Sequence, residues 1–348
     1  MTQPRGYAEK NRFGRVLRIP TPTPEWTGLG AINSYVVLPP EGARRSVTLI
    51  DTGMRMDASF EAMRRGFKEF GLALESIDRI LVTHAHGDHF GQAKRLRDLS
   101  GAQVFASAGE AERMRTGFSP AAMRGGNGAH WMRRFGMPDE IVEAKAPTGA
   151  MPSDLSEPIE VDGVLAEGDR IDLGEFTLEV VATPGHCDDH IVFYERDLGL
   201  IFSGDHLLTD ISPVPLLHVP PPGQERRPSL ITFMRSLAKA EALRAEATHP
   251  AHGDVIWDHK KLIAGYRLHH ERRKLQIARR LGKRVMTPFE LGAEIFPKYF
   301  RDPRQSFLVM SEVVGHLDLL IEDGTCAWEH DGLVDRVRLV SDVHLQDQ

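Results

Sequence analysis

Six consecutive residues, His84-Ala85-His86-Gly87-Asp88-His89, set the tightest limit on what this chain can fold into. Imidazoles and a carboxylate packed this closely gain little from ordinary packing, whereas divalent metal ions bind them well. The run follows the apolar, β-prone residues Ile80-Leu81-Val82, so we expect it where a buried strand reaches the surface. His84 and His86 point the same way along an extended chain and suit one ion. The last two residues of the run turn away and can serve a second ion.

Four further apolar, strand-like segments end in a metal-capable side chain beside glycine or proline. They are residues 46–50 before Asp51, 176–180 before His186, 200–202 before Asp205 and 247–251 before His252. Glycine and proline allow the backbone to turn sharply at the end of a strand. If the five strand ends meet at one edge, they form a site for two metal ions on a β scaffold. Residues 59–70 and 90–99 have helical character, so helices should cover the sheets.

Composition excludes several other kinds of protein. The 348 residues suffice for one large domain and a small one. A net charge of −6 gives no overall reason to bind nucleic acid or a membrane surface. Cys187 and Cys326 are too few for a disulfide framework. Residues 1–11 are polar and contain no apolar run of signal-peptide length, and no stretch approaches the length of a membrane span. We therefore expect a cytoplasmic protein that binds no membrane.

The full set of motifs resembles that of the metallo-β-lactamase-fold hydrolases. The matching motifs are His-x-His-x-Asp-His at 84–89, Thr-Pro-Gly-His at 183–186, Ser-Gly-Asp at 203–205 and His-Pro-Ala-His-Gly at 249–253. They follow the family's order and cover residues 15–255, approximately. The resemblance implies an α+β protein whose catalytic domain is an αβ/βα sandwich with metal ions at one edge.

The resemblance also implies a role for each candidate site residue. One ion would be held by His84, His86 and His186. The other would be held by Asp88, His89 and His252, and Asp205 would bridge the two. Asp51 and His190 would orient ligands without touching the ions. Zinc is the expected metal, and iron or manganese would also accept this mixture of nitrogen and oxygen ligands.

The ligand set predicts hydrolysis. Two divalent ions about 3.5–4 Å apart can share a water molecule and lower its pKa from 15.7 towards neutrality. The resulting hydroxide would attack an electrophilic carbon or phosphorus, and Asp88 is the candidate catalytic residue that holds or accepts the proton. Redox use of the same site is one alternative. A binding module with structural metals is another. The full set of seven ligands disfavours it, because a structural site closes its coordination and needs no bridging water.

Members of the family differ in substrate, and single positions separate some of them. Asp205 stands where the β-lactamases of this fold usually have serine or cysteine, and Leu208 where quorum-signal lactonases carry tyrosine. Residues 183–190 and the segment from His269 onward resemble a subgroup with a C-terminal winged-helix domain, the β-lactamase-like protein 2 and glyoxalase II-like group. That subgroup includes endoribonucleases and thioesterase-like proteins. Cys187 replaces its usual threonine, so this thiol either contacts the metals or is simply buried.

Residues 258–348 are expected to form a second domain after a catalytic domain of residues 1–257. A long helix over 258–282 precedes the capping box Thr287-Pro288-Phe289-Glu290, which starts a second helix. Helical spacing of apolar residues over 306–321 predicts a third helix, and 325–328 and 334–340 can pair as a hairpin. Three helices and a hairpin are the order of elements in a winged helix.

The charge of this second domain is divided unevenly. Residues 260–284 carry ten Lys or Arg and one Glu, whereas 285–348 carry five Lys or Arg and twelve Asp or Glu. The third helix contains no Lys or Arg, which argues against reading DNA. The basic segment therefore either neutralises the acidic tail or binds an anion, such as RNA phosphates or those of a coenzyme A or carrier-protein arm.

Two segments are expected beside the edge of the sheets where the metal ions would bind. Residues 108–147 contribute His130, Trp131, Arg133 and Arg134 as candidate substrate contacts, with packing as the alternative for the tryptophan. The proline-rich residues 206–229 follow Asp205 directly and should form one rigid wall of the site.

These inferences predict a dinuclear metal-dependent hydrolase of a small-molecule acyl substrate such as a thioester, including carrier- or coenzyme A-linked forms. A single-strand-specific endoribonuclease using the same site is the alternative. The basic helix favours RNA, whereas the acidic tail and the lack of aromatic residues interleaved with the basic ones favour the acyl substrate. A homodimer remains compatible with the sequence.

Overall fold

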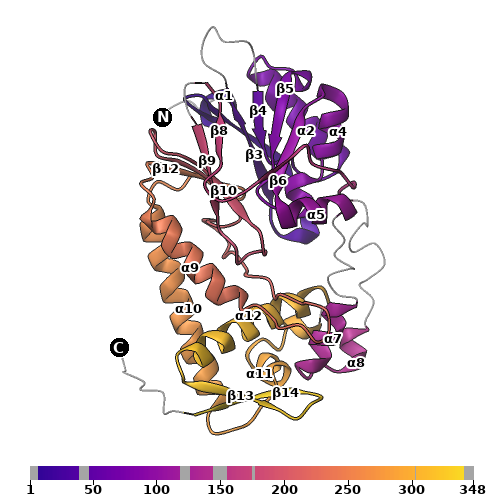
Figure 1. The fold of residues 1–348 in the computed structure, drawn as a ribbon, viewed down its shortest axis with the longest axis vertical. Coiled ribbons are helices and arrows are strands. Elements are labelled where there is room, and N and C mark those ends of the chain that lie inside the picture. The colour runs from indigo at the N-terminus through magenta and orange to yellow at the C-terminus, as the bar shows by residue number, and fades with distance from the viewer. Residues whose placement is uncertain are drawn as a thin grey trace, which may run out of the picture.

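Two stacked β-sheets with helices on their outer faces form the upper part of the molecule, and a helical module lies below them (Figure 1). The structure is a computed structural model. It describes residues 7–38, 47–117, 126–143, 155–174, 177–301 and 303–340. Within these ranges, no helix is both long enough and apolar enough to cross a bilayer.

The first sheet has seven strands in sequence order. They are β1 (Arg12–Phe13), β2 (Val16–Pro22), β3 (Ala31–Val37), β4 (Val47–Ile50), β5 (Ile77–Leu81), β6 (Gln103–Ser107) and β7 (Gly163–Leu165). The strands from β1 to β4 pair antiparallel, and those from β4 to β7 pair parallel. The parallel strands therefore end at the same edge of the sheet.

The second sheet has five strands in the order β12-β11-β10-β9-β8. Their bounds are β8 (Arg170–Asp172), β9 (Thr177–Ala182), β10 (Ile191–Glu195), β11 (Leu200–Gly204) and β12 (Ala247–Pro250). Only the pair β11–β12 is parallel. Every residue of the central strand β10 is buried, because Phe193 faces the first sheet and Val192 the opposite side.

Helices lie between the strands, and some of them cover the first sheet. They are α1 (Tyr7–Lys10), α2 (Asp57–Glu69), α3 (Gly87–Phe90), α4 (Ala93–Ser100), α5 (Ala108–Thr116), α7 (Asn127–Arg134), α8 (Asp139–Val142) and α9 (Ser229–Ala242), with short 3-10 turns at Glu25–Thr27, Leu74–Ser76 and Tyr299–Arg301. Phe60, Met63 and Phe67 of α2 recur at helical spacing and pack on the outer face of the sheet. The predicted helix at 59–70 is confirmed by α2, and most of the one at 90–99 by α4, which begins at Ala93.

The C-terminal elements follow the predicted order. They are α10 (His259–Leu281), α11 (Pro288–Ile295), α12 (Pro303–Glu322), β13 (Cys326–His330) and β14 (Asp335–Leu339), the last two an antiparallel hairpin. Both hydrogen bonds of the capping box between Thr287 and Glu290 are present. A separate core that includes Leu281, Val313 and Val337 holds this module together.

Acidic neighbours neutralise much of the basic helix α10. Five of its cationic side chains, or those just after it, form ion pairs, namely Arg267 with Glu241, Arg273 with Glu312, Lys274 with Asp323, and both Arg280 and Arg284 with Glu294. The acids belong to α9, α11 and α12 or to the turn after α12. These contacts favour internal neutralisation over anion binding as the role of the basic segment.

A buried pair of histidines joins α10 to α12. The ring Nδ1 of His270 and Nε2 of His316 lie 3.0 Å apart, and Nδ1–H of His316 donates to the carbonyl of Glu312 at 2.6 Å. With Nδ1 of His316 as donor, its Nε2 accepts from Nδ1–H of His270, so the ring of His316 is neutral. Burial lowers the pKa of each histidine from 6.5 to about 3.

This pair should make stability depend on pH. Because both pKa values are depressed by folding, the unfolded chain binds more protons below about pH 6.5, so stability is full above that pH and falls towards pH 3. Each histidine should contribute roughly 1.4 kcal/mol per pH unit in that window. In urea unfolding at pH 7.5 and pH 5, the double variant His270→Leu/His316→Leu should lose less stability than the wild type. The exposed control His269→Gln should follow the wild type, and an equal loss in the double variant would contradict the assignment.

Candidate metal centre

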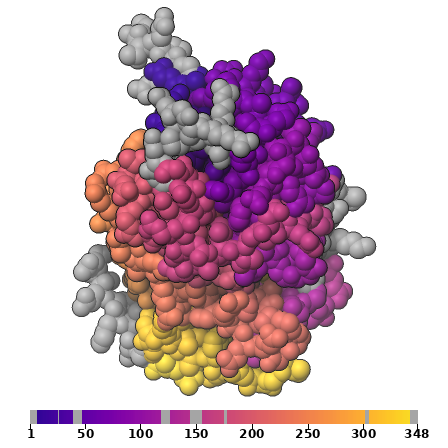
Figure 2. Space-filling model, turned by 45° about the horizontal axis from the view of Figure 1, so that its top comes forward, coloured from indigo at the N-terminus to yellow at the C-terminus, as the bar shows by residue number. Residues whose placement is uncertain are grey.

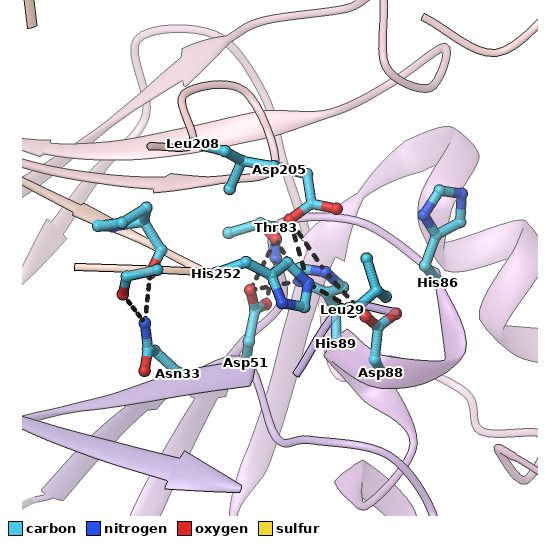
Figure 3. A network of polar contacts seen from close by, with 12 residues as sticks. Leu29, Asn33, Asp51, Thr83, His86, Asp88, His89, Asp205, Leu208 and His252 are labelled. Carbon is cyan, nitrogen blue, oxygen red and sulfur yellow. Dashed lines mark hydrogen bonds and ion pairs between the residues drawn. The ribbon is translucent and has the colours of Figure 1, made fainter. Parts of the chain in front are cut away.

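Five strand ends bring polar side chains together at one edge of the two sheets, and Figure 3 shows those after β4, β5, β11 and β12. The first sheet contributes Asp51 after β4 and the run 84–89 after β5. The second contributes His186 after β9, Asp205 after β11 and His252 after β12. The structure therefore assembles every residue that the sequence predicted as a metal ligand, and all of them except His86 are buried.

The first group contains His84, His86, His186 and Asp205. The Nδ1 of His86 lies 2.8 Å from Nε2 of His84 and 3.1 Å from Nε2 of His186, and an Asp205 oxygen lies 3.5 Å from the latter. Nitrogen ligands of a tetrahedral zinc ion are roughly 3.3 Å apart, since each lies about 2.0–2.1 Å from the ion. The four side chains therefore fit one small divalent ion.

The second group contains Asp88, His89 and His252. An Asp88 oxygen lies 3.3 Å from Nε2 of His252 and 3.9 Å from Nε2 of His89. The Oδ1 of Asp205 lies 3.4 Å from that same atom of His89, whereas its Oδ2 faces the first group. The carboxylate of Asp205 thus presents one oxygen to each group, as Figure 3 shows for the side of the second group.

Several atoms at the centre lack a hydrogen-bonding partner. Within the described part of the chain, Nε2 of His89, Nε2 of His252 and Oδ1 of Asp205 are buried and form no hydrogen bond. Buried polar atoms without a partner are rare in folded proteins, because each loses its hydration. Three such atoms facing one space are what a bound cation would satisfy.

The opposite ring nitrogens are held by acceptors. The Nδ1–H groups of His89, His186 and His252 donate to the Asp51 carboxylate at 2.8 Å, the Val214 carbonyl at 2.9 Å and the Ala31 carbonyl at 3.0 Å. A carbonyl or carboxylate can only accept, so Nδ1 carries the proton of the neutral ring, and the lone pair of Nε2 is the one that can bind a metal ion. These contacts fix both the tautomer and the direction of each ring.

Asp51 adopts an uncommon backbone conformation to hold His89. In the described part of the chain it is the one non-glycine residue with positive φ, at 55°. Its carboxylate accepts from the Thr83 amide at 2.9 Å and the Thr83 hydroxyl at 2.8 Å, in addition to His89. Aspartate tolerates this left-handed region better than most residues, and here it places the carboxylate behind the ligand histidine.

His190 supports Asp205 from the second sheet. Its Nδ1 lies 2.8 Å from the Thr183 hydroxyl, and its Nε2 accepts from the backbone amide of Asp205 at 3.3 Å. The preceding Gly204 has φ +49°, and a Cβ there would lie 2.9 Å from the ring of His190. Only glycine permits this close approach, so the strand end at Asp205 is held in one position.

Glu110 of α5 links two ligand loops and carries no local sequence signal. Its side chain, 1% exposed, accepts from the Ala85 amide at 2.9 Å and the Asp189 amide at 3.3 Å. Arg113 pairs with Glu110 and with Asp188. Asn33 of β3 acts similarly for the loop after β12, donating to the carbonyls of residues 250 and 253 (Figure 3).

The charge states suit cation binding. Burial and the neighbouring imidazoles lower the pKa of His84 well below its usual value. Burial alone would raise the pKa of Asp205, but His89 and His252 outweigh it and hold that pKa well below its usual value. Burial also lowers the pKa of His89, yet the carboxylates around it raise that pKa well above 6.5. A cation bound here would displace that proton and balance the carboxylates.

The thiol of Cys187 lies outside both groups. Burial and then Glu110 raise the pKa of Cys187 well above its usual value, so the group stays a neutral thiol. Among the described residues, neither potential ligand group includes it. These observations favour a half-buried, neutral thiol over a metal contact for this position.

The two segments expected beside the site differ in their placement. Trp131 is buried in the lower module, where Nε1–H donates to the Pro220 carbonyl at 2.8 Å. Arg134 pairs with Asp335. Arg133 pairs with Asp139, the first residue of α8, and with Glu143, directly after that helix. These three residues therefore pack and pair there, while 118–125 and 144–147 of the same segment lie outside the described residues. The chain between β11 and α9 forms no helix or strand, and its Val214 carbonyl contacts the ring of His186, so this segment does lie beside the site.

A hollow of about 340 Å³ opens beside His252. Leu29 and Ile211 supply apolar surface, and Arg18 and Asn33 supply polar groups. A mixed lining of this kind suits a small molecule with an apolar part.

Comparison with known proteins agrees with this geometry. A protein from Bacillus subtilis (strain 168) named "Probable metallo-hydrolase YqjP" is 26% identical over 332 residues, which cover 90% of this chain and 94% of that one. An atrochrysone carboxyl ACP thioesterase from Passalora fulva is 24% identical, covering 90% of this chain and 78% of its own length. The crystal structure of a metallo-beta-lactamase family protein from Thermus thermophilus is 26% identical, with a TM-score of 0.73, and the alignment covers 94% of this chain and 99% of that one.

The family model of the Metallo-beta-lactamase superfamily matches residues 27–252, which include every candidate ligand described above. Because that match spans well over half of the 348 residues, the chain belongs to the metallo-β-lactamase superfamily.

Proposed function

We propose that this protein is a dinuclear metal-dependent hydrolase that acts on small acyl compounds, with acyl thioesters as the first substrate class. The observation that carries the proposal is the position of Asp205, whose two oxygens face two separate groups of ligand atoms. A bridging carboxylate of this kind suits a pair of ions that act together on one substrate.

Each ion would have its own set of residues. His84, His86 and His186 would hold one, Asp88, His89 and His252 the other, and Asp205 both. Zinc suits the histidine-rich set, and iron or manganese is compatible with it. Two such ions would supply Lewis acidity and a nucleophile at neutral pH. The Asp88 carboxylate, whose pKa the nearby His89 and His252 hold at about 2 against the effect of burial, stays ionised and would orient the attacking water.

Two observations support an acyl substrate. The hollow beside His252 offers apolar surface from Leu29 and Ile211, and the relative from Passalora fulva is named a thioesterase for an acyl carrier protein. Carrier- or coenzyme A-linked thioesters therefore belong to the proposed range. The alternative, a single-strand endoribonuclease, relies on the basic helix α10, and the ion pairs of that helix weaken it.

The proposal extends to the organisation of the chain. Residues 1–257 would form the catalytic domain, and residues 258–348 a winged-helix-like domain that begins with α10. The protein would act in the cytoplasm, without a membrane partner, and a homodimer is compatible with this assignment.

Metal content provides a direct test of the two ligand groups. Purified wild-type protein loaded with zinc should contain two ions per chain by elemental analysis, and His84→Ala and His252→Ala should each lose one. His330→Gln, an exposed histidine of β13, is the matched control and should keep both ions. Two ions retained in both ligand variants would contradict the assignment.

Asp51→Asn tests the support of His89. Asparagine also tolerates positive φ, so the backbone should be preserved while the charged acceptor of the Nδ1–H group is lost. We expect about 10–100-fold weaker binding of one ion in competition with a chelator. Unchanged affinity for both ions would show that the hydrogen bond has no role in binding.

A substrate panel separates the two candidate activities. Zinc-loaded protein should hydrolyse acyl thioesters and leave unstructured RNA intact, and Asp88→Asn should lower thioester turnover by about 10²–10⁴-fold. The variant Lys260→Gln, at an exposed position in the first turn of α10, serves as the matched control. Cleavage of RNA with inert thioesters would overturn the acyl proposal.

A further inference from the structure

The chain between β11 and α9 forms two hydrogen bonds with the backbone and ring of His186. The carbonyl of Val214 accepts from the ring Nδ1–H at 2.9 Å, and the amide of Leu216 donates to the His186 carbonyl at 3.2 Å. The direction of the imidazole therefore depends on where residues 214–216 lie. This segment belongs to no helix or strand, so something outside it must fix its position.

The next residue is attached to the C-terminal module. The amide of Leu217 donates to the hydroxyl of Ser311 in α12 at 3.0 Å. That hydroxyl in turn donates to the Phe307 carbonyl one turn earlier at 2.9 Å, which leaves its lone pairs for Leu217. The Leu217 side chain is buried in a cluster with Met310 and Val314 of the same helix. One face of α12 thus holds the segment directly after its contacts with His186.

A buried ion pair makes a second attachment to the same helix. Arg226 contacts both carboxylate oxygens of Asp318, one of them at 2.7 Å, and the two side chains are only 10% and 6% exposed. Asp318 lies seven residues, about two turns, after Ser311, so both project from one face of α12. In Figure 2 the surface of this irregular segment (salmon) adjoins that of the C-terminal module (yellow).

We propose that Ser311 and Asp318 are positioning residues for His186, acting through residues 214–226. The inference rests on the proposed role of His186 as a metal ligand. Holding Val214 in place selects the tautomer with the proton on Nδ1 and keeps Nε2 directed at the first ligand group. The C-terminal module then supports the metal site without contacting it. It holds the irregular segment in place, and that segment in turn keeps the ring of His186 aligned.

The test uses full-length protein and compares Ser311→Ala with Val313→Ala. Both residues are buried in α12, but Val313 packs into the separate core of the C-terminal module. Ser311→Ala should weaken the binding of one of the two zinc ions about tenfold in competition with a chelator. Val313→Ala should lower the free energy of unfolding and leave both affinities unchanged. Equal effects of the two variants, or no effect of Ser311→Ala, would overturn the proposal.

A second readout does not depend on bound metal or on activity. The exchange of the His186 ring Nδ1 proton with water, followed by NMR in metal-free protein, should be faster in Ser311→Ala than in the wild type and in Val313→Ala. Unchanged exchange in Ser311→Ala would overturn the positioning role. A wild type that binds no ions would instead contradict the proposed function, so the two failures are distinguishable.

The ion pair is tested by Arg226→Gln, Asp318→Asn and the double variant. If both residues act through their mutual contact, the three variants should weaken the binding of the same ion to the same extent, because the attachment is lost in each. Losses that add in the double variant, or wild-type affinity in all three, would overturn the role of Asp318.

Discussion

The carboxylate of Asp205 is the constraint on which the rest of the site depends. It is buried between two groups of imidazoles, and a buried carboxylate is tolerated only where positive charge or hydrogen-bond donors surround it. Strands from both sheets are needed to supply those groups, since His84 and His89 follow β5 whereas His186 and His252 follow β9 and β12. The stacking of the two sheets thus creates the site at their shared edge. The interior between the sheets contributes apolar packing that holds them together.

A second set of contacts keeps these ligands rigid. Each of three imidazoles is held on the side away from the site by an acceptor from a different element, and only one of these acceptors, Asp51, is a side chain. The others are carbonyls of Ala31 and Val214. Rigidity of this kind matters because ligands already aligned lose little freedom when an ion binds.

The sequence indicated the polar side chains that gather at the strand ends, including Asp51 and His190 behind them, but it missed the supports that are backbone groups or lie in ordinary helices, for a physical reason. Metal-capable side chains at strand ends stand out as residue types in a local pattern, and the capping box at Thr287 is equally local. Backbone carbonyls have no residue identity to recognise. Glu110 and Ser311 lie within ordinary helical segments and act on loops more than 20 residues away. The sequence leaves Trp131 open between a substrate contact and packing. Only the tertiary structure decides, because the segment around Pro220 that it packs against is distant in sequence.

The central claim is that two ions bind on either side of Asp205. Crystals of the full-length protein grown with zinc, measured by anomalous diffraction at the zinc absorption edge, test it most directly. The account predicts two peaks about 3.5–4 Å apart, with one oxygen of Asp205 directed at each. A single peak, or two peaks of which one lies away from Asp205, would contradict it.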